Sequence, residues 1–189
     1  MPPIQYCSHC AAPVQRRIPQ GDNRERIVCT ACTTVHYQNP QIVVGCVAFA
    51  EEGYLLCQRA IEPRSGFWTI PGGYLELNES TEEGALREAH EEAGAKLNIL
   101  SLLAVYSLTH ISQVQILYLA KMQTLNLCAG EESLQVKIFP WQKIPWDSLA
   151  FPSNYWALHH AQAMRKNPAL TPDLRSGNSL LPPGSALDY

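Results

Sequence analysis

Short runs of bulky apolar and β-branched residues recur between residues 41 and 141, and polar or glycine-containing turns separate them. Runs of this kind are typical of β-strands. They predict strands over residues 41–50, 54–60, 97–108, 114–122 and 133–141. Only Glu51, Glu52 and Gly53 separate the first two runs, so we expect these two strands to pair as a hairpin.

Two other segments, residues 80–93 and 153–166, have the apolar spacing of a helix. The first segment has clear ends. Ser80 can cap its start, Glu83 stands three residues later as the partner of a capping box, and Gly94 follows its end. Strands on either side of two helices predict a mixed α/β domain.

The two ends of the chain differ from this central part. Residues 1–38 contain no long apolar run, and turn residues stand at their middle, which predicts a small separate module. Residues 167–189 contain four prolines with several glycine and serine residues, so we interpret them as an extended or mobile tail. The main domain then covers residues 39–166. An alternative is that the tail packs on a neighbouring subunit through Leu180, Leu181 and Tyr189.

The composition is that of a soluble globular protein, with 46% hydrophobic and 16% charged residues in a chain of 189. No apolar run approaches the roughly 18 residues of a membrane span. The first residues also lack the basic and apolar segments of a secretion signal, so we expect a cytoplasmic protein. The net charge of -3 gives no general attraction to nucleic acid or to an anionic membrane.

Four of the seven cysteines form two close pairs. Two residues separate Cys7 from Cys10 and Cys29 from Cys32, and eighteen residues lie between the pairs. This spacing is typical of a four-thiolate zinc site. Such a site has no open coordination position, so we expect the zinc to be structural and to order a module with little apolar core. The alternative is four ordinary free cysteines.

Other potential ligands near the pairs are not needed to complete this site. We interpret His9 and His36 as surface residues or as neighbours of the ligands. The remaining cysteines, Cys46, Cys57 and Cys128, are interpreted as small buried hydrophobic residues.

The helix predicted over residues 80–93 concentrates carboxylates on one side. Each residue of a helix advances about 100°, which places Glu88, Glu91 and Glu92 within a sector of about 100°, with Arg87 at its margin. A solvated acidic face is the alternative interpretation of such a charge run.

A Pro-Gly-Gly turn at residues 71–73 precedes this helix. Glycine lets the backbone approach a ligand closely. A loop of this kind beside a helix with several carboxylates predicts a site for a hard cation, Mg²⁺ or Mn²⁺, bound together with phosphate oxygens.

Seven positions in this region match the Nudix box, G-x5-E-x7-R-E-U-x-E-E-x-G-U, in which U is a bulky apolar residue. The matching residues are Gly73, Glu79, Arg87, Glu88, Glu91, Glu92 and Gly94. Ala89 and Ala95 occupy U positions with a smaller side chain. Over residues 6–165 the chain resembles the zinc-ribbon Nudix hydrolases, most closely bacterial relatives of the plant plastid enzyme that splits FAD. The resemblance implies a Nudix α/β/α sandwich with a mixed sheet, preceded by a small zinc ribbon.

This resemblance implies an enzyme that cleaves a nucleoside diphosphate linked to another group at its pyrophosphate. Glu88 and Glu92 are then expected to be the principal Mg²⁺ ligands, with Glu91 as a further ligand or as the base that activates water. The backbone carbonyl of Gly73 is expected as an extra contact of the ion.

The resemblance also implies supporting residues around the ion. Glu79 is expected to pair with Arg87 and to orient the helix. Some Nudix enzymes draw a further carboxylate from a later loop, and Glu132 stands where that residue would come from, with Glu131 as the less favoured neighbour. The alternative for either loop residue is a solvated acid.

Arg59 and Arg64 are candidate phosphate contacts, and the alternative for each is a surface arginine. A flavin or adenine ring needs an aromatic or apolar face to stack on. By residue type, the candidates for this stacking are Phe67, Trp68, Tyr74, Tyr106, Tyr118 and Trp141. Of these we predict Tyr74 as a substrate-binding residue.

The favoured substrate implied by the resemblance is FAD, cleaved to FMN and AMP, with ADP-ribose next. Known NADH-preferring relatives carry S-Q-P-W-P-F-P after the box. This chain has no such sequence, which does not support selectivity for NADH, and NADH is kept only as an alternative substrate. A different alternative is a non-catalytic nucleotide-binding sensor whose ribbon contacts nucleic acid, although the intact glutamates of the box argue against it. Many relatives pair as dimers, so the resemblance also implies a homodimer.

Overall fold

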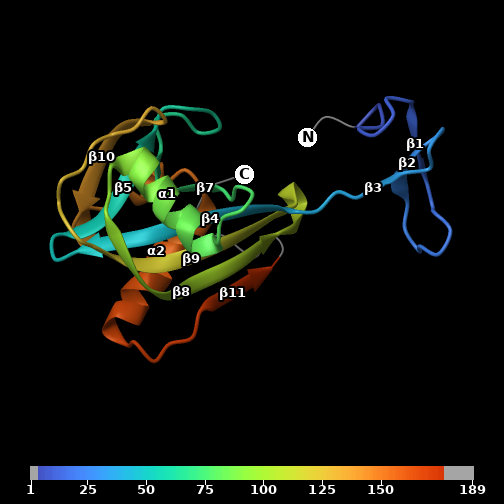
Figure 1. Ribbon diagram of the computed structural model, residues 1–189. Coiled ribbons are helices and arrows are strands. Elements are labelled where there is room, and N and C mark those ends of the chain that lie inside the picture. The colour runs from blue at the N-terminus through green and yellow to red at the C-terminus, as the bar shows by residue number, and fades with distance from the viewer. Residues whose placement is uncertain (1–3, 177–189) are drawn as a thin grey trace. The chain divides into compact units, whose positions relative to one another are not determined.

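The computed structural model describes residues 4–176, and these fall into two compact units that divide between Asn39 and Pro40 (Figure 1). Residues 1–3 and 177–189 lie outside the described part of the chain. The proposed contacts of Leu180, Leu181 and Tyr189 therefore fall outside it as well.

The first unit is a small antiparallel sheet of three strands. The strands are β1 (Val14–Arg17), β2 (Arg26–Cys29) and β3 (Val35–His36), in the order β1-β2-β3. Ile27 and Val28 of β2 are buried, together with Cys7 and Cys29. So small an apolar core gives little folding free energy by itself, which favours stabilisation by a bound metal.

The second unit is built on a mixed sheet with the strand order β10-β5-β4-β9-β8-β11. These strands are β4 (Gln41–Ala50), β5 (Gly53–Arg59), β8 (Leu97–Leu108), β9 (Gln113–Met122), β10 (Ser133–Phe139) and β11 (Asp173–Ser176). Short strands β6 (Trp68–Thr69) and β7 (Gly72–Tyr74) pair with β5 and β4. The pairs β4–β9 and β8–β11 are parallel and the other pairs are antiparallel.

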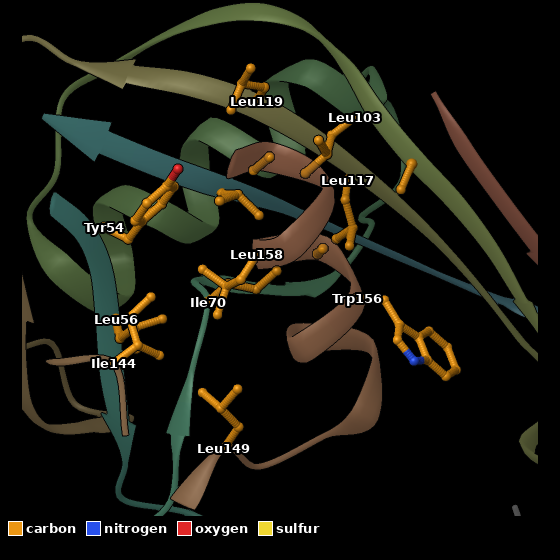
Figure 2. Packing of buried hydrophobic residues seen from close by; sticks show 14 of the residues in the cluster. Tyr54, Leu56, Ile70, Leu103, Leu117, Leu119, Ile144, Leu149, Trp156 and Leu158 are labelled. Carbon is orange, nitrogen blue, oxygen red and sulfur yellow. The ribbon is translucent and has the colours of Figure 1, made fainter. Parts of the chain in front are cut away.

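Each face of this sheet is covered by one long helix (Figure 1). Helix α1 (Thr81–Ala93) packs through small residues, Ala85, Ala89 and Ala93, on the face that includes Val44. Helix α2 (Pro152–Lys166) packs on the opposite face, where Trp156 and Leu158 lie beside Leu117 (Figure 2). Three short 3-10 helices occupy connections, at Thr109–Ile111, Trp141–Lys143 and Trp146–Ser148. The predicted α/β/α sandwich with a mixed sheet is confirmed.

The long predicted elements form within one or two residues of their expected ends. The sequence did not predict β11, in which residues 173–176 pair in parallel with β8. The interpretation of Cys128 as a buried residue is wrong, since its side chain is exposed, whereas Cys46 and Cys57 are buried. Within the described residues, no helix is both long enough and apolar enough to cross a membrane.

Candidate active site and zinc site

The four paired cysteines of the first unit converge on one point. Their Sγ atoms all lie within 4.8 Å of one another. The Sγ atoms of Cys7 and Cys32 are 3.7 Å apart, and those of Cys10 and Cys29 are 3.5 Å apart. Tetrahedral zinc with Zn–S bonds of about 2.3 Å places its sulfurs about 3.8 Å apart. The cluster therefore fits a closed, structural zinc site.

Neighbouring polar groups lower the pKa of Cys29 and Cys32 and so favour the thiolate form of these two cysteines. The backbone N–H groups of His9 and Cys32 each lie 3.4 Å from a sulfur, that of Cys7 and that of Cys29 respectively. The Thr34 hydroxyl lies 3.1 Å from Cys32 Sγ, and this hydrogen bond is the largest cause that lowers the pKa of Cys32 to about 6. Ligand sulfurs must be deprotonated to bind zinc, so these contacts support the site.

In the second unit, local interactions fix where helix α1 begins and ends. The Glu83 N–H donates to Ser80 Oγ at 3.2 Å, and the Ser80 N–H donates to Glu83 Oε2 at 2.8 Å. The predicted capping box is thus formed. Gly94 ends the helix in the left-handed region, at φ 61°. The caps fix the ends of α1, and packing of Ala85, Ala89 and Ala93 on the sheet sets its rotation and with it the direction in which each glutamate points.

Arg87 is the centre of the hydrogen bonds that organise the outer part of α1. Its Nε and Nη2 donate to both oxygens of Glu79, at 3.0 and 2.8 Å. Its Nη1 donates to Glu88 Oε1 at 2.8 Å and to Glu91 Oε2 at 2.9 Å, and Nη2 also reaches the carbonyl oxygen of Tyr74 at 3.1 Å. The hydrogen bond from Arg87 holds the pKa of Glu79 at about 2. One guanidinium therefore ties the helix to the loop before it.

Glu92 is the most deeply buried acid of this helix, with 7% of the residue exposed. Burial, and then the charge of Glu88, raises its pKa to about 8. Its Oε2 atom is buried and has no hydrogen-bond partner in the described part of the chain. Burial also raises the pKa of Glu88, against the lowering effect of Arg87. A buried, ionised carboxylate needs a compensating positive charge. Glu88 and Glu92 together therefore fit a site for a hard divalent cation.

Gly73 lies directly against the carboxylate of Glu88. A Cβ atom at residue 73 would come 2.6 Å from that carboxylate, so a side chain there would displace Glu88 from its observed position. The Pro-Gly-Gly turn is thus placed beside the carboxylates, as the sequence predicts.

Glu91 and the two loop glutamates differ in their surroundings. The Glu91 side chain is 57% exposed and paired with Arg87. Glu131 and Glu132 are both exposed, and both line the cavity described below. Of these two, it is Glu132 whose charge acts on Glu88 and on Glu92 and raises their pKa values. Among the described residues, three or more potential metal-ligand atoms lie within 4.8 Å of one another only at the four cysteines. The acids of α1 do not form such a group, and the Glu91 carboxylate is hydrogen-bonded to Arg87.

The loop that contains Glu131 and Glu132 is packed tightly on the end of α1. The Gly130 N–H donates to the carbonyl oxygen of Glu92 at 3.1 Å. A Cβ atom on Gly130 would overlap the carbonyl oxygen of Glu91, so the contact requires glycine. The Ala60 N–H in turn donates to the carbonyl oxygen of Glu132 at 2.8 Å, which joins this loop to the end of β5.

A cavity of about 1100 Å³ opens beside these carboxylates. Arg59, Arg64 and Tyr74, the predicted substrate-binding residues, all line it. The Arg59 guanidinium lies 5.3 Å from the centre of the Phe151 ring, and its Nε donates to the carbonyl oxygen of Pro63 at 2.8 Å. The structure thus brings the predicted arginines, Tyr74 and the acids of α1 to one cavity.

Most of the predicted stacking residues lie elsewhere. Trp68 packs edge-on against Phe139, Tyr106 is fully buried in the core, and the Tyr118 hydroxyl lies 2.6 Å from the Thr81 hydroxyl. Of the six aromatic candidates, Tyr74 alone lines this cavity.

Several residues that line the cavity were not predicted. They are polar or aromatic residues from β6, β9 and the start of α2: Thr69, Gln115, Phe151, Ser153 and Asn154. For Gln115 the sequence does carry a signal. Side chains alternate along a strand, and Leu117 and Leu119 face the core on the α2 side, so residue 115 should face the core as well. A polar residue at such a core-facing position is unusual and marks a candidate binding residue. For the others no sequence signal was present.

An α/β/α sandwich with buried acids beside a large cavity, preceded by a four-cysteine ribbon, defines a hydrolase of the Nudix type. Comparison with protein-family models agrees: residues 5–38 match "Nudix N-terminal", a zinc-ribbon model, and residues 39–160 match "NUDIX domain". The chain therefore belongs to the Nudix hydrolase family, and the predicted resemblance to the zinc-ribbon Nudix hydrolases is confirmed.

Individual relatives share different parts of the chain. An ADP-ribose pyrophosphatase of Methanocaldococcus jannaschii is 30% identical over 121 residues, which cover 61% of this chain and 69% of that protein. An NAD-capped RNA hydrolase NudC of Vibrio parahaemolyticus is 31% identical over 93 residues, 48% of this chain but 33% of that protein. The crystal structure of a NUDIX hydrolase from Nitrosomonas europaea is 44% identical, with a TM-score of 0.83 over 92% of this chain and 98% of that chain.

Proposed function

We propose that this protein hydrolyses the pyrophosphate bond of an ADP-linked compound, ADP-ribose or FAD, with the help of Mg²⁺ or Mn²⁺. The observation that carries the proposal is the buried, unpartnered Oε2 atom of Glu92, beside Glu88 at the edge of the large cavity. Buried carboxylates of this kind are held in place when a cation and phosphate oxygens share the site.

Glu88 and Glu92 would hold the cation, and Glu132 is the loop acid best placed to join them. When bound, a divalent ion neutralises charge on the pyrophosphate and lowers the pKa of a coordinated water. The backbone at Gly73 gives this group of acids the room it needs.

The chain's own residues supply the remaining functions. Arg87 holds Glu79, Glu88 and Glu91 in a fixed arrangement. Arg59 and Arg64 line the cavity with positive charge that suits phosphate oxygens.

Glu91, which is exposed and lines the cavity, would accept the proton of the attacking water. In the reaction the water oxygen forms a bond to one phosphorus, and the bridging oxygen leaves with the other phosphoryl group. Two phosphomonoesters result.

The cavity also bears on the size of the substrate. Its volume of about 1100 Å³ is at the upper end of the roughly 300–1,000 Å³ of small-molecule sites, which suits a dinucleotide-sized compound. The relative from Methanocaldococcus jannaschii supports ADP-ribose. FAD remains the substrate that the resemblance to FAD-splitting Nudix hydrolases implies, and NADH is kept as a comparison because of the NudC relatives.

The test is incubation of the purified protein with Mg²⁺, or with Mn²⁺, and each of ADP-ribose, FAD, NADH and a nucleoside triphosphate, followed by chromatography of the products. We expect AMP with ribose 5-phosphate from ADP-ribose, or AMP with FMN from FAD, and almost none of either product from the Glu92→Gln variant. If the wild-type protein binds these compounds but converts none of them, it is a nucleotide-binding sensor and the proposal is wrong.

A further inference from the structure

Gln115 of β9 is a largely buried residue whose amide opens on the large cavity. The residue is 9% exposed and lines the large cavity. Its side chain has no hydrogen-bond partner within residues 4–176. Two other glutamines of this region do have hydrogen-bond partners. Gln113 Nε2 donates to the Tyr74 hydroxyl, and Gln123 Nε2 donates to the carbonyl oxygen of Leu97. The amide nitrogen and oxygen of Gln115 are not sealed from solvent, so they are open to the cavity and available to a ligand.

The side chain of Gln115 points to the α2 side of the sheet. Side chains alternate along a strand, and Leu117 and Leu119 of the same strand belong to the core beneath α2. In the sheet, Gln115 pairs with Val43 of β4 and Tyr106 of β8. A leucine or valine would be expected at this position, and the glutamine opens instead on the cavity.

A second amide lines the same cavity from α2. Asn154 is 3% exposed, and its Nδ2 donates to the Thr69 hydroxyl oxygen at 3.0 Å. The Thr69 hydroxyl itself donates to the carbonyl oxygen of Ile70 at 3.0 Å. These bonds fix the orientation of the Asn154 amide and leave its carbonyl oxygen without a donor from the described residues.

The chemistry of this part of the cavity differs from that of the metal side. Around Gln115 and Asn154 the lining consists of neutral polar groups and of apolar residues such as Ile70 and Leu117. The carboxylates and arginines belong to α1, the end of β5 and the loops. Amide side chains recognise flat, uncharged rings whose edges carry a donor beside an acceptor, as glutamine and asparagine do with adenine.

We propose that Gln115, together with Asn154, binds the heterocyclic end of the substrate and so determines which nucleotides the enzyme accepts. This inference rests on the proposed function, since it assigns the ring of the same ADP-linked substrate. The ring is adenine or, for FAD, either adenine or the flavin. Both present neighbouring donors and acceptors to an amide.

The test measures binding of reaction products by calorimetry in the presence of Mg²⁺, so that it does not depend on turnover. The ligands are AMP, FMN and ribose 5-phosphate, and the last has a phosphate and a sugar but no ring. The variant is Gln115→Met, which keeps the length of the side chain and removes its hydrogen bonds. The matched control is Gln123→Met, because Gln123 is exposed just beyond the end of β9 and does not line the cavity.

We expect Gln115→Met to weaken binding of AMP, of FMN or of both by about tenfold or more, the range for a lost amide pair. Binding of ribose 5-phosphate should not change, and Gln123→Met should bind all three ligands as the wild type does. Loss confined to AMP identifies adenine as the ring, and loss confined to FMN identifies the flavin.

A stability measurement separates this role from a structural one. Replacing an amide that makes no hydrogen bond to the described residues should leave the melting temperature of the ligand-free protein unchanged or raise it. The inference is overturned if Gln115→Met binds AMP and FMN as tightly as the wild type, if it loses ribose 5-phosphate equally, or if the wild type does not prefer either nucleotide to ribose 5-phosphate. Absence of hydrolysis with normal ring recognition would refute the proposed function alone.

Discussion

Replacing Glu92 with glutamine removes the charge that the metal-free fold accommodates least well. Burial and the charge of Glu88 raise the pKa of Glu92 from its usual 4.5 to about 8. The folded state thus holds this proton more tightly than the unfolded state does. The stability that Glu92 contributes is therefore complete below pH 4.5, falls as the pH rises, and is lost as the pH passes through about 8.

The size of the effect follows from the two pKa values. Because the unfolded chain loses this proton more readily than the folded protein, the raised pKa lowers the free energy of unfolding by on the order of 4 kcal/mol at pH 8 and by less than about 1 kcal/mol at pH 5, relative to acid pH. The free energy of unfolding of Glu92→Gln, relative to the wild type, should therefore increase by on the order of 3 kcal/mol between pH 5 and pH 8. For a protein of this size that corresponds to roughly 6–12 °C in melting temperature.

The assay is urea or thermal unfolding of both proteins at pH 5 and pH 8, without added divalent cations, with the zinc content checked by elemental analysis. The control is Glu91→Gln, whose side chain is 57% exposed and which should change stability by less than about 1 kcal/mol. Added Mg²⁺ should stabilise the wild type at pH 8 and have much less effect on Glu92→Gln. A pH-independent difference between the two proteins would show that Glu92 is not a strained, cation-requiring acid.

Two further predictions concern Arg87 and the zinc site. The Arg87→Lys variant cannot make the paired hydrogen bonds to Glu79. Its kcat/KM for the preferred substrate should therefore fall by about 10–100-fold, and the Mg²⁺ concentration for half-maximal activity should rise. A loss of kcat/KM of less than about twofold would contradict a positioning role for Arg87. The Cys32→Ser variant should contain well below one zinc atom per chain. Its residues before Pro40 should become sensitive to protease, while the second unit stays intact. Full zinc retention with an unchanged digestion pattern would refute the structural zinc site.

The carboxylate helix was predictable because its signals are local. The capping box of Ser80 and Glu83 and the stop at Gly94 are written in consecutive residues. They fix where the helix begins and ends, and the helical period then places Glu88 and Glu92 on one side. The two pairs of cysteines are local in the same sense, since each pair occupies one short turn.

What the sequence could not supply depends on contacts between distant segments. The helical period puts Glu91 beside Glu92, yet the structure leaves Glu91 exposed and buries Glu92. The contribution of Phe151 depends on where α2 begins relative to β5, which no local pattern specifies. Most aromatic residues proposed for stacking are needed in the core instead, as Tyr106 shows.

The pairing of β11 with β8 also bears on how the protein can be shortened. Asp173–Ser176 lies along residues 104–107 of β8 and covers backbone groups that would otherwise form an open edge of the sheet. The family match ends at residue 160, inside α2 and before β11. A fragment cut at that boundary would lose the end of the helix and expose an edge strand rich in apolar residues, which favours edge-to-edge aggregation. Fragments of this enzyme should therefore extend at least to Ser176, past the limit that sequence similarity suggests.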